Sequence, residues 1–542
     1  MMNNTKISNL VVNILNELGV NEACLSPGAR NSPIISALSN TDFNIHPVLD
    51  ERSSGFYALG LSKVIKSPVV VCCTSGSALA NLYPAVIEAR MTEVPLIIIS
   101  ADRPKEIVGT GENQTINQEN LYNDYVKHYL SISCKDDTRE SILIKITKIL
   151  NLSLGKVDGE LLSEKGPVHI NFHFDEPLLS DNSKSGFKNT EIKFINPKDN
   201  NILSLKLAKN IKKTIIVCGQ SDLQNYSSTI DNISKKLGAP ILSDISSNIT
   251  SNNNIISFYD HFIDSIEAPD LIIRFGKKPL SKKLLSLLKK YNDITYLFRF
   301  RTIYNDDILQ SNLINHVELK DYEYDKSWIS TFKKNDNLIK NKIDLINKNA
   351  NLNEFTFSNQ ISKKFPENSN VFIGNSLIIR AFNSFSKKQF NKIKFYSNRG
   401  TSGIDGNIAT ALGIASQSNE NNYLVIGDQS FMHDIGSLQI LAEKKQKLSI
   451  FIINNYGGSI FNYLPNLNKV DSYSFKNYIL NRHSNEFESI VESYGMRYKR
   501  ISSINDLKSI DINESKVYEI IIDEKDSIKY IRNFSTSLYS QD

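Results

Sequence analysis

The sequence predicts an α/β protein with three doubly wound parallel sheets. A chain of 542 residues is too long for a single hydrophobic core. Short apolar runs bounded by turn residues alternate with amphipathic stretches, which is the strand, helix, strand rhythm of a parallel sheet. Because this rhythm occurs in three separate sets, we expect three α/β domains, covering residues 1–185, 195–350 and 351–542.

The first set is clearest between residues 69 and 101. VVVCCT (69–74) and VPLIIISA (94–101) have strand length, and SALANLYPAVIEARM between them is typical of a helix. The second set has no obvious catalytic cluster and contains KTIIVCGQSD, APILSDIS, PDLIIRFG and ITYLFRF. The third set is the densest in motifs and contains VFIGNSL, KIKFYSNRGTSGIDG, NYLVIGDQS, LSIFIINN and YEIIIDE.

Two polar stretches separate these sets, around residues 180–200 and 326–353. Either could be a linker. The second contains WISTF and LIKNKIDLI, whose apolar spacing fits a helix at least as well.

Composition excludes several classes of protein. Hydrophobic residues make up 40% and charged residues 22%, which is ordinary for a globular protein and argues against disorder. A net charge of +5 is too weak to imply nucleic acid binding. Five cysteines without CxxC spacing make disulfide or metal roles improbable. The first residues lack a basic region followed by an apolar stretch, and no apolar run approaches the roughly 18 residues of a membrane helix, so we expect a cytoplasmic protein without a membrane span.

The sharpest signal is the stretch from Leu424 to Phe461, which predicts a strand, a Gly-Asp turn, a helix, a strand and an Asn-Asn-x-Gly-Gly turn. Both turns follow parallel strands, so they meet at the sheet edge where such sheets bind ligands. Asp428 and Asn455 can then converge. A carboxylate, an amide oxygen and a backbone carbonyl form an incomplete set of hard oxygen ligands, which diphosphate oxygens and a water could complete around Mg²⁺. A Gly-Asp pair alone is more often an ordinary loop.

The complete arrangement resembles the signature of thiamine diphosphate (ThDP) enzymes, and the resemblance implies their three-domain fold. It also implies ThDP with Mg²⁺ or Mn²⁺ as cofactors, with Asp428, Asn455 and the Gly457 carbonyl as metal ligands. The remaining residues that we expect to contact the cofactor are Ser402, Gly403, Ile404, Gly427 and Ser430. Among them, Ile404 resembles the apolar wedge that bends the cofactor.

An acidic pair follows the strand-like start of HPVLDERSSGFYALGLS (46–62). Locally, Asp50 and Glu51 could do no more than favour a helix N-terminus. The resemblance to ThDP enzymes implies a second role for Glu51, as the catalytic glutamate that activates the cofactor. In that family Glu51 and Asp428 would come from different subunits, so we expect a homodimer or a homotetramer.

Six segments indicate which group of ThDP enzymes the sequence resembles. SPGARNSP (26–33), DERSSGFYALGL (50–61), SADRP (100–104), GENQTINQ (111–118), GPVHINFHFDEPL (166–178) and SNRGTSGIDG (397–406) resemble the 2-succinyl-5-enolpyruvyl-6-hydroxy-3-cyclohexene-1-carboxylate synthases of menaquinone biosynthesis. The resemblance implies a ThDP-dependent transferase. In that family 2-oxoglutarate is decarboxylated and the resulting carbanion adds to isochorismate in a 1,4-addition.

Both substrates are dicarboxylates, which suits guanidinium and ammonium groups. The resemblance implies two sets of polar contacts. Arg30, Arg103, Gln114, Lys282 and Lys283 would bind isochorismate, and Ser376, Arg380 and Arg399 would bind the part derived from 2-oxoglutarate. Apolar walls would come from Ile460, Phe461 and Leu464. Each has a plain alternative, since a lone arginine is more often in a surface ion pair and KKPLSKK alone would be a solvated charge run.

Three positions depart from the family pattern. Ala29 stands where serine is expected, Lys283 where arginine is frequent, and Ser459 where glutamine is expected. Ala29 removes a hydroxyl donor and Lys283 replaces a planar fork with a point charge, so we expect altered substrate affinity before altered chemistry.

Two other functions stay open. One is another ThDP decarboxylase or carboligase, such as an acetolactate synthase-like enzyme acting on pyruvate, although pyruvate's one carboxylate cannot use so many cations. The other is a catalytically silent ligand-binding relative, for which Glu51, Asp428 and Asn455 would have no chemical need.

Overall fold

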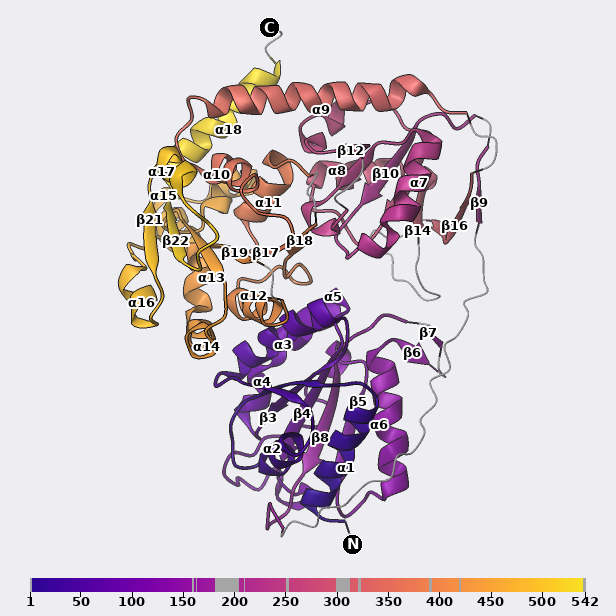
Figure 1. Cartoon of the computed structure of the whole chain (residues 1–542), viewed down its shortest axis with the longest axis vertical. Helices are drawn as coiled ribbons and strands as arrows, with labels where there is room; N and C mark the ends of the chain where they lie inside the picture. Colours follow the sequence, from indigo (N-terminus) through magenta and orange to yellow (C-terminus); the bar gives the residue numbers. More distant parts are fainter. Residues whose placement is uncertain are drawn as a thin grey trace.

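The computed structural model describes residues 2–157, 160–161, 163–180, 204–208, 210–249, 253–298, 312–319, 323–388, 392–418 and 421–539. Almost all of the linker expected around residues 180–200 lies outside this part of the chain. The N-terminal part forms the lower half of the molecule in Figure 1, and the central and C-terminal parts lie side by side above it.

Within the described residues, three six-stranded parallel sheets form the framework. The first has the order β2-β1-β3-β4-β8-β5, with β1 (Glu22–Leu25), β2 (Asn44–Pro47), β3 (Val69–Cys73), β4 (Leu96–Asp102), β5 (Tyr129–Ser133) and β8 (Val168–His173). Alternate residues of β3 and β4 face opposite sides of this sheet. One face is covered by α1 (Asn4–Glu17), α2 (Ser32–Ser39) and α6 (Arg139–Ser153), and the other by α3 (Glu51–Ile65), α4 (Ser77–Asn81) and α5 (Tyr83–Thr92).

The second sheet has the order β12-β11-β10-β13-β14-β15. Its strands are β10 (Thr214–Cys218), β11 (Ile241–Ser243), β12 (Ile255–Ile256), β13 (Leu271–Phe275), β14 (Thr295–Phe298) and β15 (Asn312–Ile314). Helix α7 (Ser227–Leu237) covers one face, while α8 (Lys282–Lys290) and α9 (Lys326–Asn347) cover the other. Apart from these sheets, β6 (Lys156–Val157) pairs with β7 (Glu160–Leu161) and β9 (Ser204–Lys206) with β16 (His316–Glu318).

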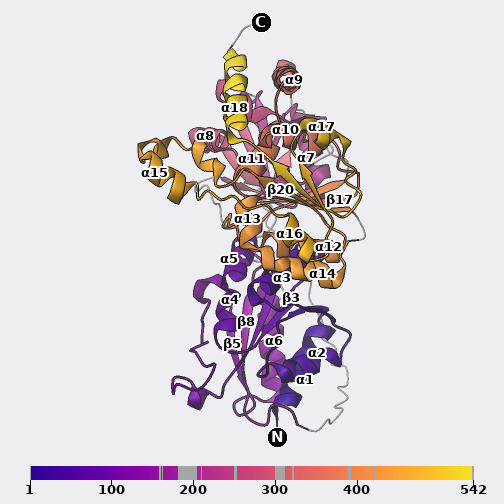
Figure 2. The ribbon, with the colours of Figure 1, turned by 90° about the vertical axis from the view of Figure 1, so that its left-hand side faces the viewer.

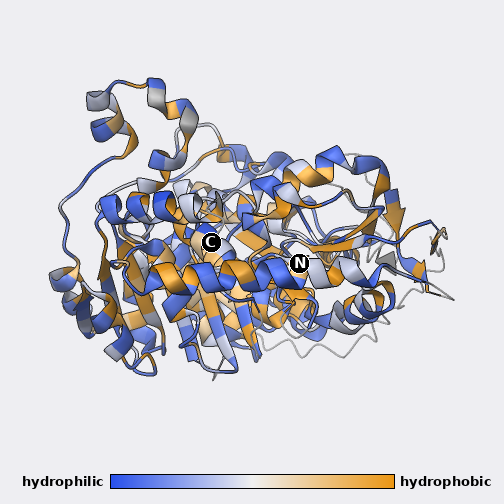
Figure 3. Cartoon of the chain, turned by 90° about the horizontal axis from the view of Figure 1, so that it is seen from above, coloured by the Kyte–Doolittle hydropathy of each residue, from blue (hydrophilic) through white to orange (hydrophobic). Residues whose placement is uncertain are grey.

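The stretch weighed above as either linker or helix is the helix α9. Hydrophilic and hydrophobic residues alternate along it where it crosses the molecule in Figure 3. Its buried side chains include Trp328 and Phe332, and the indole N–H of Trp328 donates to the carbonyl of Thr214 at 2.9 Å. Helix α9 therefore covers the central sheet and reaches α18 (Glu524–Tyr539) of the C-terminal part.

The third sheet has the order β18-β17-β19-β20-β22-β21. Its strands are β17 (Ser369–Ile373), β18 (Ile393–Tyr396), β19 (Asn421–Gly427), β20 (Ser449–Asn454), β21 (Tyr498–Ile501) and β22 (Val517–Ile521). One face is covered by α10 (Glu354–Ile361), α11 (Leu377–Phe385) and α17 (Ile504–Ser509), and the other by α12 (Asn407–Ser416), α13 (Asp428–His433), α14 (Leu438–Lys444) and α16 (Glu488–Ser493).

The first and third sheets share one hydrophobic core, which α3 and α12 join. These helices approach so closely that a Cβ atom on Gly60 would lie 2.1 Å from the carbonyl oxygen of Thr410. A Cβ atom on Gly413 would lie 2.0 Å from the carbonyl oxygen of Tyr57. Glycine at both positions therefore allows the N-terminal and C-terminal parts to pack face to face.

The prediction of an α/β fold with parallel sheets covered on both faces is confirmed. Each sheet falls inside one of the three predicted ranges, but the domain boundaries themselves stay a prediction. All five cysteines are free in the described structure, and Cys72 and Cys73 are buried at the end of β3. Among the described helices, none has the length and apolar character needed to cross a membrane.

Candidate active site

Asp428 and Asn455 follow two neighbouring strands of the third sheet. Strands β19 and β20 pair in parallel, β19 ends at Gly427 and β20 ends at Asn454, so both turns lie at the same edge. Asp428 is only 3% exposed. Its Oδ2 accepts the backbone N–H groups of Asn455, at 3.2 Å, and Gly457, at 3.0 Å. The carboxylate thus holds the Asn-Asn-x-Gly-Gly turn in place.

These turns carry buried oxygen atoms suited to a divalent cation. The Asn455 side chain donates from Nδ2 to Oε1 of Glu354 at 2.8 Å, which fixes the opposite direction for its Oδ1. That Oδ1 is buried and has no hydrogen-bond partner among the described residues. Together with the carboxylate of Asp428 it provides hard oxygen ligands of the kind that Mg²⁺ prefers. Within the described chain no group of three His, Cys, Asp or Glu could hold a metal, so the fit rests on this mixed oxygen set.

Residues that the sequence did not single out surround the two turns. The imidazole Nε2 of His483 lies 3.2 Å from Oδ2 of Asp428, and Arg482 donates to the carbonyl of Asn455 at 3.0 Å. Burial raises the pKa of Glu354, which also accepts from Ser527. Glu354 lies in the first turn of α10, where an acidic side chain commonly stabilises the positive end of the helix dipole. The local sequence therefore does not indicate a functional role for it.

The loop between β18 and α12 carries Arg399, Ser402, Gly403 and Ile404. Asn375 organises this loop, because its Nδ2 donates to the carbonyls of Asn398 and Gly403, both at 2.7 Å. Its Oδ1 accepts from Arg399 at 3.0 Å. Ser402 has a φ of +61°, a left-handed conformation that is unusual for a residue with a side chain. The polar contacts of Asn375 hold the loop in this shape.

Ser430 and Ile404 link this loop to the Gly-Asp turn. The Ser430 hydroxyl donates to the Ile404 carbonyl at 2.8 Å, and Asn407 donates to Ser430 at 2.9 Å. Ile404 is 42% exposed although it is apolar. An exposed isoleucine beside these polar turns is consistent with the expected apolar contact to a cofactor.

Two arginines gather near Ser376, which follows β17. Arg380 donates to the carbonyl of Ser376, and burial lowers the pKa of both Arg380 and Arg399. The positive charge of Arg380 lowers the pKa of Arg399 further. Two partly buried guanidinium groups of like charge suit an anionic ligand, whose charge would offset their repulsion.

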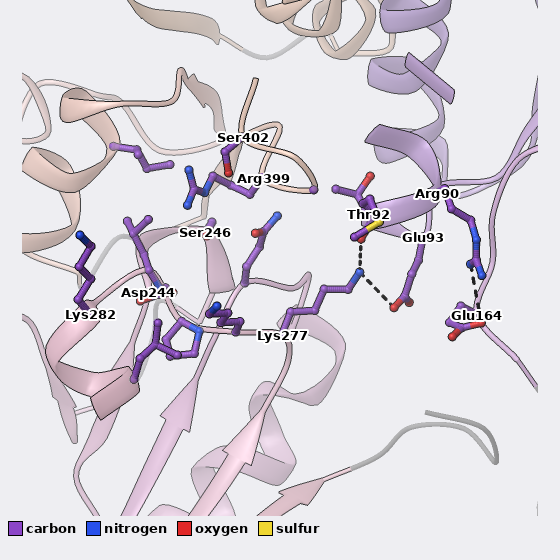
Figure 4. Close-up of a pocket in the computed structure, with 18 of the residues that line it drawn as sticks. Arg90, Thr92, Glu93, Glu164, Asp244, Ser246, Lys277, Lys282, Arg399 and Ser402 are labelled. Atoms are coloured by element: carbon purple, nitrogen blue, oxygen red, sulfur yellow. Dashed lines mark hydrogen bonds and ion pairs between the residues drawn. The ribbon is translucent and has the colours of Figure 1, made fainter. Parts of the chain in front are cut away.

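A cavity of about 770 Å³ lies where the three parts of the chain meet. Lys282, Arg399 and Ser402 line it among the residues predicted from sequence (Figure 4). Lys277 also lines it and donates to the Met91 carbonyl at 2.6 Å. Lys283, by contrast, forms an ion pair with Asp264 at 2.9 Å, and its side chain is 47% exposed. Only Lys282 of the lysine pair therefore faces the cavity.

The other predicted residues lie at the carboxyl edge of the first sheet. Glu51 opens α3 and accepts from Asn81 at 3.3 Å, and Arg30 donates to the Phe174 carbonyl at 3.1 Å. Arg103, directly after β4, donates to the carbonyl of Asn113 at 3.0 Å. These side chains share one edge of one sheet. Their hydrogen bonds within the described structure stay in the N-terminal part.

Gln114 is held by a buried network behind this edge. The Gln114 side chain donates to the backbone carbonyl of Ser75 at 3.1 Å, and the Ser75 hydroxyl donates to the backbone carbonyl of Gln114 at 2.9 Å. Gln118 donates to Asn171 at 2.8 Å, and Asn171 donates to Asp102 at 2.8 Å. The network fixes the loop that bears Gln114, and sequence reasoning missed it because its members lie far apart in the sequence.

The predicted apolar wall lies just after the Asn-Asn-x-Gly-Gly turn, and Ile460 packs against a hydrophobic core cluster. Ile460 and Phe461 belong to the 3-10 helix η9 (Ser459–Tyr463), and Leu464 follows it. Farther along, α15 (Ser472–Ser474) projects from the body in Figure 2. Ser459 is buried, and its hydroxyl has no hydrogen-bond partner in the described part of the chain.

Comparison with known families agrees with this geometry. Residues 5–121 match the N-terminal TPP binding domain of thiamine pyrophosphate enzymes, and residues 378–512 match their C-terminal TPP binding domain. Thiamine pyrophosphate is another name for ThDP. By class, this is a thiamine pyrophosphate enzyme. The matched ranges contain Glu51, Asp428 and Asn455, whereas Lys282 and Lys283 lie between them.

Relatives with similar sequences specify the family within this class. A 2-succinyl-5-enolpyruvyl-6-hydroxy-3-cyclohexene-1-carboxylate synthase of Listeria monocytogenes is 33% identical over 491 residues, covering 84% of this chain and 83% of the relative. Synthases of that name from Bacillus pumilus and Chlorobium phaeobacteroides are each 32% identical, over 87% and 96% of this chain and 86% and 95% of the relative. The chain belongs to this synthase family. The predicted resemblance is thereby confirmed.

Proposed function

We propose that this protein uses ThDP to decarboxylate 2-oxoglutarate and to join the remaining four-carbon unit to isochorismate by 1,4-addition. The product would be 2-succinyl-5-enolpyruvyl-6-hydroxy-3-cyclohexene-1-carboxylate, an intermediate of menaquinone biosynthesis. The observation that carries the proposal is the gathering of Ser376, Arg380 and Arg399 around the loop that also bears Ser402. Two guanidinium groups there can bind the distal carboxylate of 2-oxoglutarate.

In this proposal the turns after β19 and β20 hold the metal and the diphosphate. Asp428, the Asn455 side-chain oxygen and the Gly457 carbonyl would bind Mg²⁺ or Mn²⁺, and Gly427 and Ser430 would contact the diphosphate. The unpartnered, buried Oδ1 of Asn455 supports the metal assignment. Ser402, Gly403 and Ile404 would contact the rings. When bound, ThDP supplies a carbon that attacks the 2-oxo group and accepts the electrons released with CO₂.

Glu51 would act from a second subunit. Its position at the carboxyl edge of the first sheet, in the first turn of α3, supports a role toward a ligand bound at that edge. Its carboxylate would hold a proton against the pyrimidine ring of the cofactor. Since the contacts of Glu51 and Asp428 stay in different parts of the chain, a homodimer is the smallest complete enzyme in this proposal. A cytoplasmic location suits such a biosynthetic enzyme.

Isochorismate would bind between the carboxyl edge of the first sheet and the carboxyl edge of the third sheet. Arg30, Arg103 and Gln114, which share the sheet edge of Glu51, would approach it from the same subunit as Glu51, and Lys282 from the subunit that provides Asp428. Lys282 lines the same cavity as Arg399, which supports one continuous site. Lys283 would have to leave Asp264 to take part. The number of cations argues against a pyruvate-specific, acetolactate synthase-like enzyme.

The test is release of CO₂ from 2-oxoglutarate by the purified protein with ThDP and Mg²⁺, with and without isochorismate, together with mass spectrometry of the product. We expect release that requires ThDP, and the adduct only when isochorismate is present. Release from pyruvate in preference to 2-oxoglutarate would support the acetolactate synthase-like alternative. No release from either acid would support a silent binding protein.

A further inference from the structure

The loop that bears Arg399 and Ser402 is held from outside its own domain. Glu88 of α5, in the N-terminal part, accepts the backbone N–H groups of Gly400 at 2.9 Å and Thr401 at 2.8 Å. It also accepts from the Thr401 hydroxyl at 3.1 Å. Glu88 is 2% exposed, so this is a buried carboxylate whose partners are two consecutive backbone donors and a hydroxyl. Such charge-assisted hydrogen bonds are stronger than neutral ones.

A positive side chain from the same part holds the preceding residues. Lys63 of α3 donates to the carbonyl of Ser397 at 3.0 Å and to Oδ1 of Asn398 at 2.7 Å. Burial lowers the pKa of Lys63 to about 8, and the negative charge of Glu88 acts in the opposite direction. The Glu88 carboxylate therefore accepts hydrogen bonds from the loop, and the Lys63 ammonium group donates hydrogen bonds to it. Their opposite charges lower the free-energy cost of burying each group.

The loop has little room to adopt another shape. A Cβ atom on Gly400 would lie 2.8 Å from Oε2 of Glu88, so the absence of a side chain there allows the carboxylate to approach. Asn375 holds the same loop from its own domain through Asn398, Arg399 and Gly403. Glu88, from the N-terminal part, and Asn375, from the C-terminal part, thus bind neighbouring residues of the same loop.

We propose that Glu88 is a positioning residue for the reaction, which sets the place of Arg399 and Ser402 through the backbone of Gly400 and Thr401. The inference rests on the proposed function of those two residues. Glu88 itself touches neither substrate nor cofactor in this scheme. Its role makes the loop's geometry depend on how α5 packs against the C-terminal part, so the N-terminal part contributes to substrate binding within its own chain.

The first test is Glu88→Gln, which keeps the size of the side chain but offers only one acceptor oxygen to the two N–H groups. Hydrogen exchange of the ligand-free protein reports on the loop without any assumption about activity. We expect exchange of the Gly400 and Thr401 amides to accelerate about tenfold, because a buried donor loses its partner. Asp137→Asn is the matched control, since Asp137 is a buried acid that accepts the Ser133 N–H at 3.1 Å in the turn directly after β5.

The second readout separates positioning from general destabilisation. For Glu88→Gln we expect the concentration of 2-oxoglutarate at half-maximal CO₂ release to rise about tenfold, with a smaller fall in kcat. Thr401→Val removes only the hydroxyl contact and should raise this half-saturating concentration about twofold to threefold. This variant tests the proposal if Glu88→Gln does not fold. Loop exchange and half-saturation like those of Asp137→Asn would overturn the proposal. If the wild type releases no CO₂, the proposed function fails, and the exchange data still decide whether Glu88 holds the loop.

Discussion

Replacing Asp428 by Asn separates its structural role from its proposed role toward metal. The carboxylate accepts three backbone N–H groups, since Oδ2 binds those of Asn455 and Gly457 and Oδ1 binds that of Gln429 at 2.6 Å. An asparagine can place its single oxygen at the Oδ2 position and keep the first two. It then turns an NH₂ group toward the N–H of Gln429.

The cost to folding follows from these contacts. One charge-assisted hydrogen bond, worth about 1.5–3 kcal/mol, is lost, and two others become neutral bonds worth about 0.5–1.5 kcal/mol each. Because burial of a neutral amide is easier than burial of a carboxylate, we expect a net loss of about 1–3 kcal/mol in the free energy of unfolding of the ligand-free protein. The loss of the anionic ligand should weaken Mg²⁺-dependent ThDP binding at least about a hundredfold.

The assay pairs urea unfolding of the ligand-free protein with ThDP titration at fixed Mg²⁺, before and after chelation. Asp434→Asn is the control, because Oδ2 of Asp434 also accepts two backbone N–H groups, from Ile408 at 2.7 Å and Ala409 at 3.1 Å. It should lower stability without removing the effect of Mg²⁺. Equal losses of ThDP affinity in both variants, or unchanged affinity in Asp428→Asn, would refute the metal assignment.

Three further predictions concern other residues. Glu51→Gln should bind ThDP but exchange the C2 proton of the cofactor far more slowly, and normal exchange by NMR would refute its role. Gly60→Ala should cost about 1–3 kcal/mol by forcing α3 and α12 apart, whereas Gly436→Ala, which meets no atom within 4 Å, should not lower the melting temperature comparably. Burial raises the pKa of Asp434 to about 6 from 3.8, so the folded protein binds more protons than the unfolded chain between these values and loses stability as pH rises through them. The free energy of unfolding of Asp434→Asn should therefore rise relative to that of the wild type by about 2 kcal/mol between pH 4 and pH 7, and a constant difference in urea unfolding would contradict this.

The strands and both ligand-bearing turns could be predicted because their signals are local. Apolar runs of strand length, broken by Gly-Asp and Asn-Asn, fix where β19 and β20 end, and parallel topology then brings Asp428 and Asn455 to one edge. Residues matched to the family could be assigned roles only through that resemblance.

The supporting contacts could not be predicted, because they join distant parts of the chain. Glu88 and Gly400 are 312 positions apart, and nothing in PAVIEARM distinguishes Glu88 from a surface acid. Asn375 and His483 likewise have ordinary local sequences. For Lys283 the family resemblance implied the same role as for Lys282, and its ion pair with Asp264 at the start of α8 could not be predicted from the local pattern. Pairing of this kind depends on three-dimensional packing that local pattern does not encode.

The division of the site between subunits leads to a decisive mixing experiment. Glu51→Gln and Asp428→Asn should each be nearly inactive alone. If Glu51 acts on the cofactor held by Asp428 of the partner, a heterodimer of the two variants has one site with both native residues and one site with neither. Co-expression with two affinity tags and purification through both should therefore recover about half of the wild-type activity per dimer. If both residues served a cofactor within one chain, every site in the heterodimer would lack one of them, and the mixture would stay as inactive as its parents.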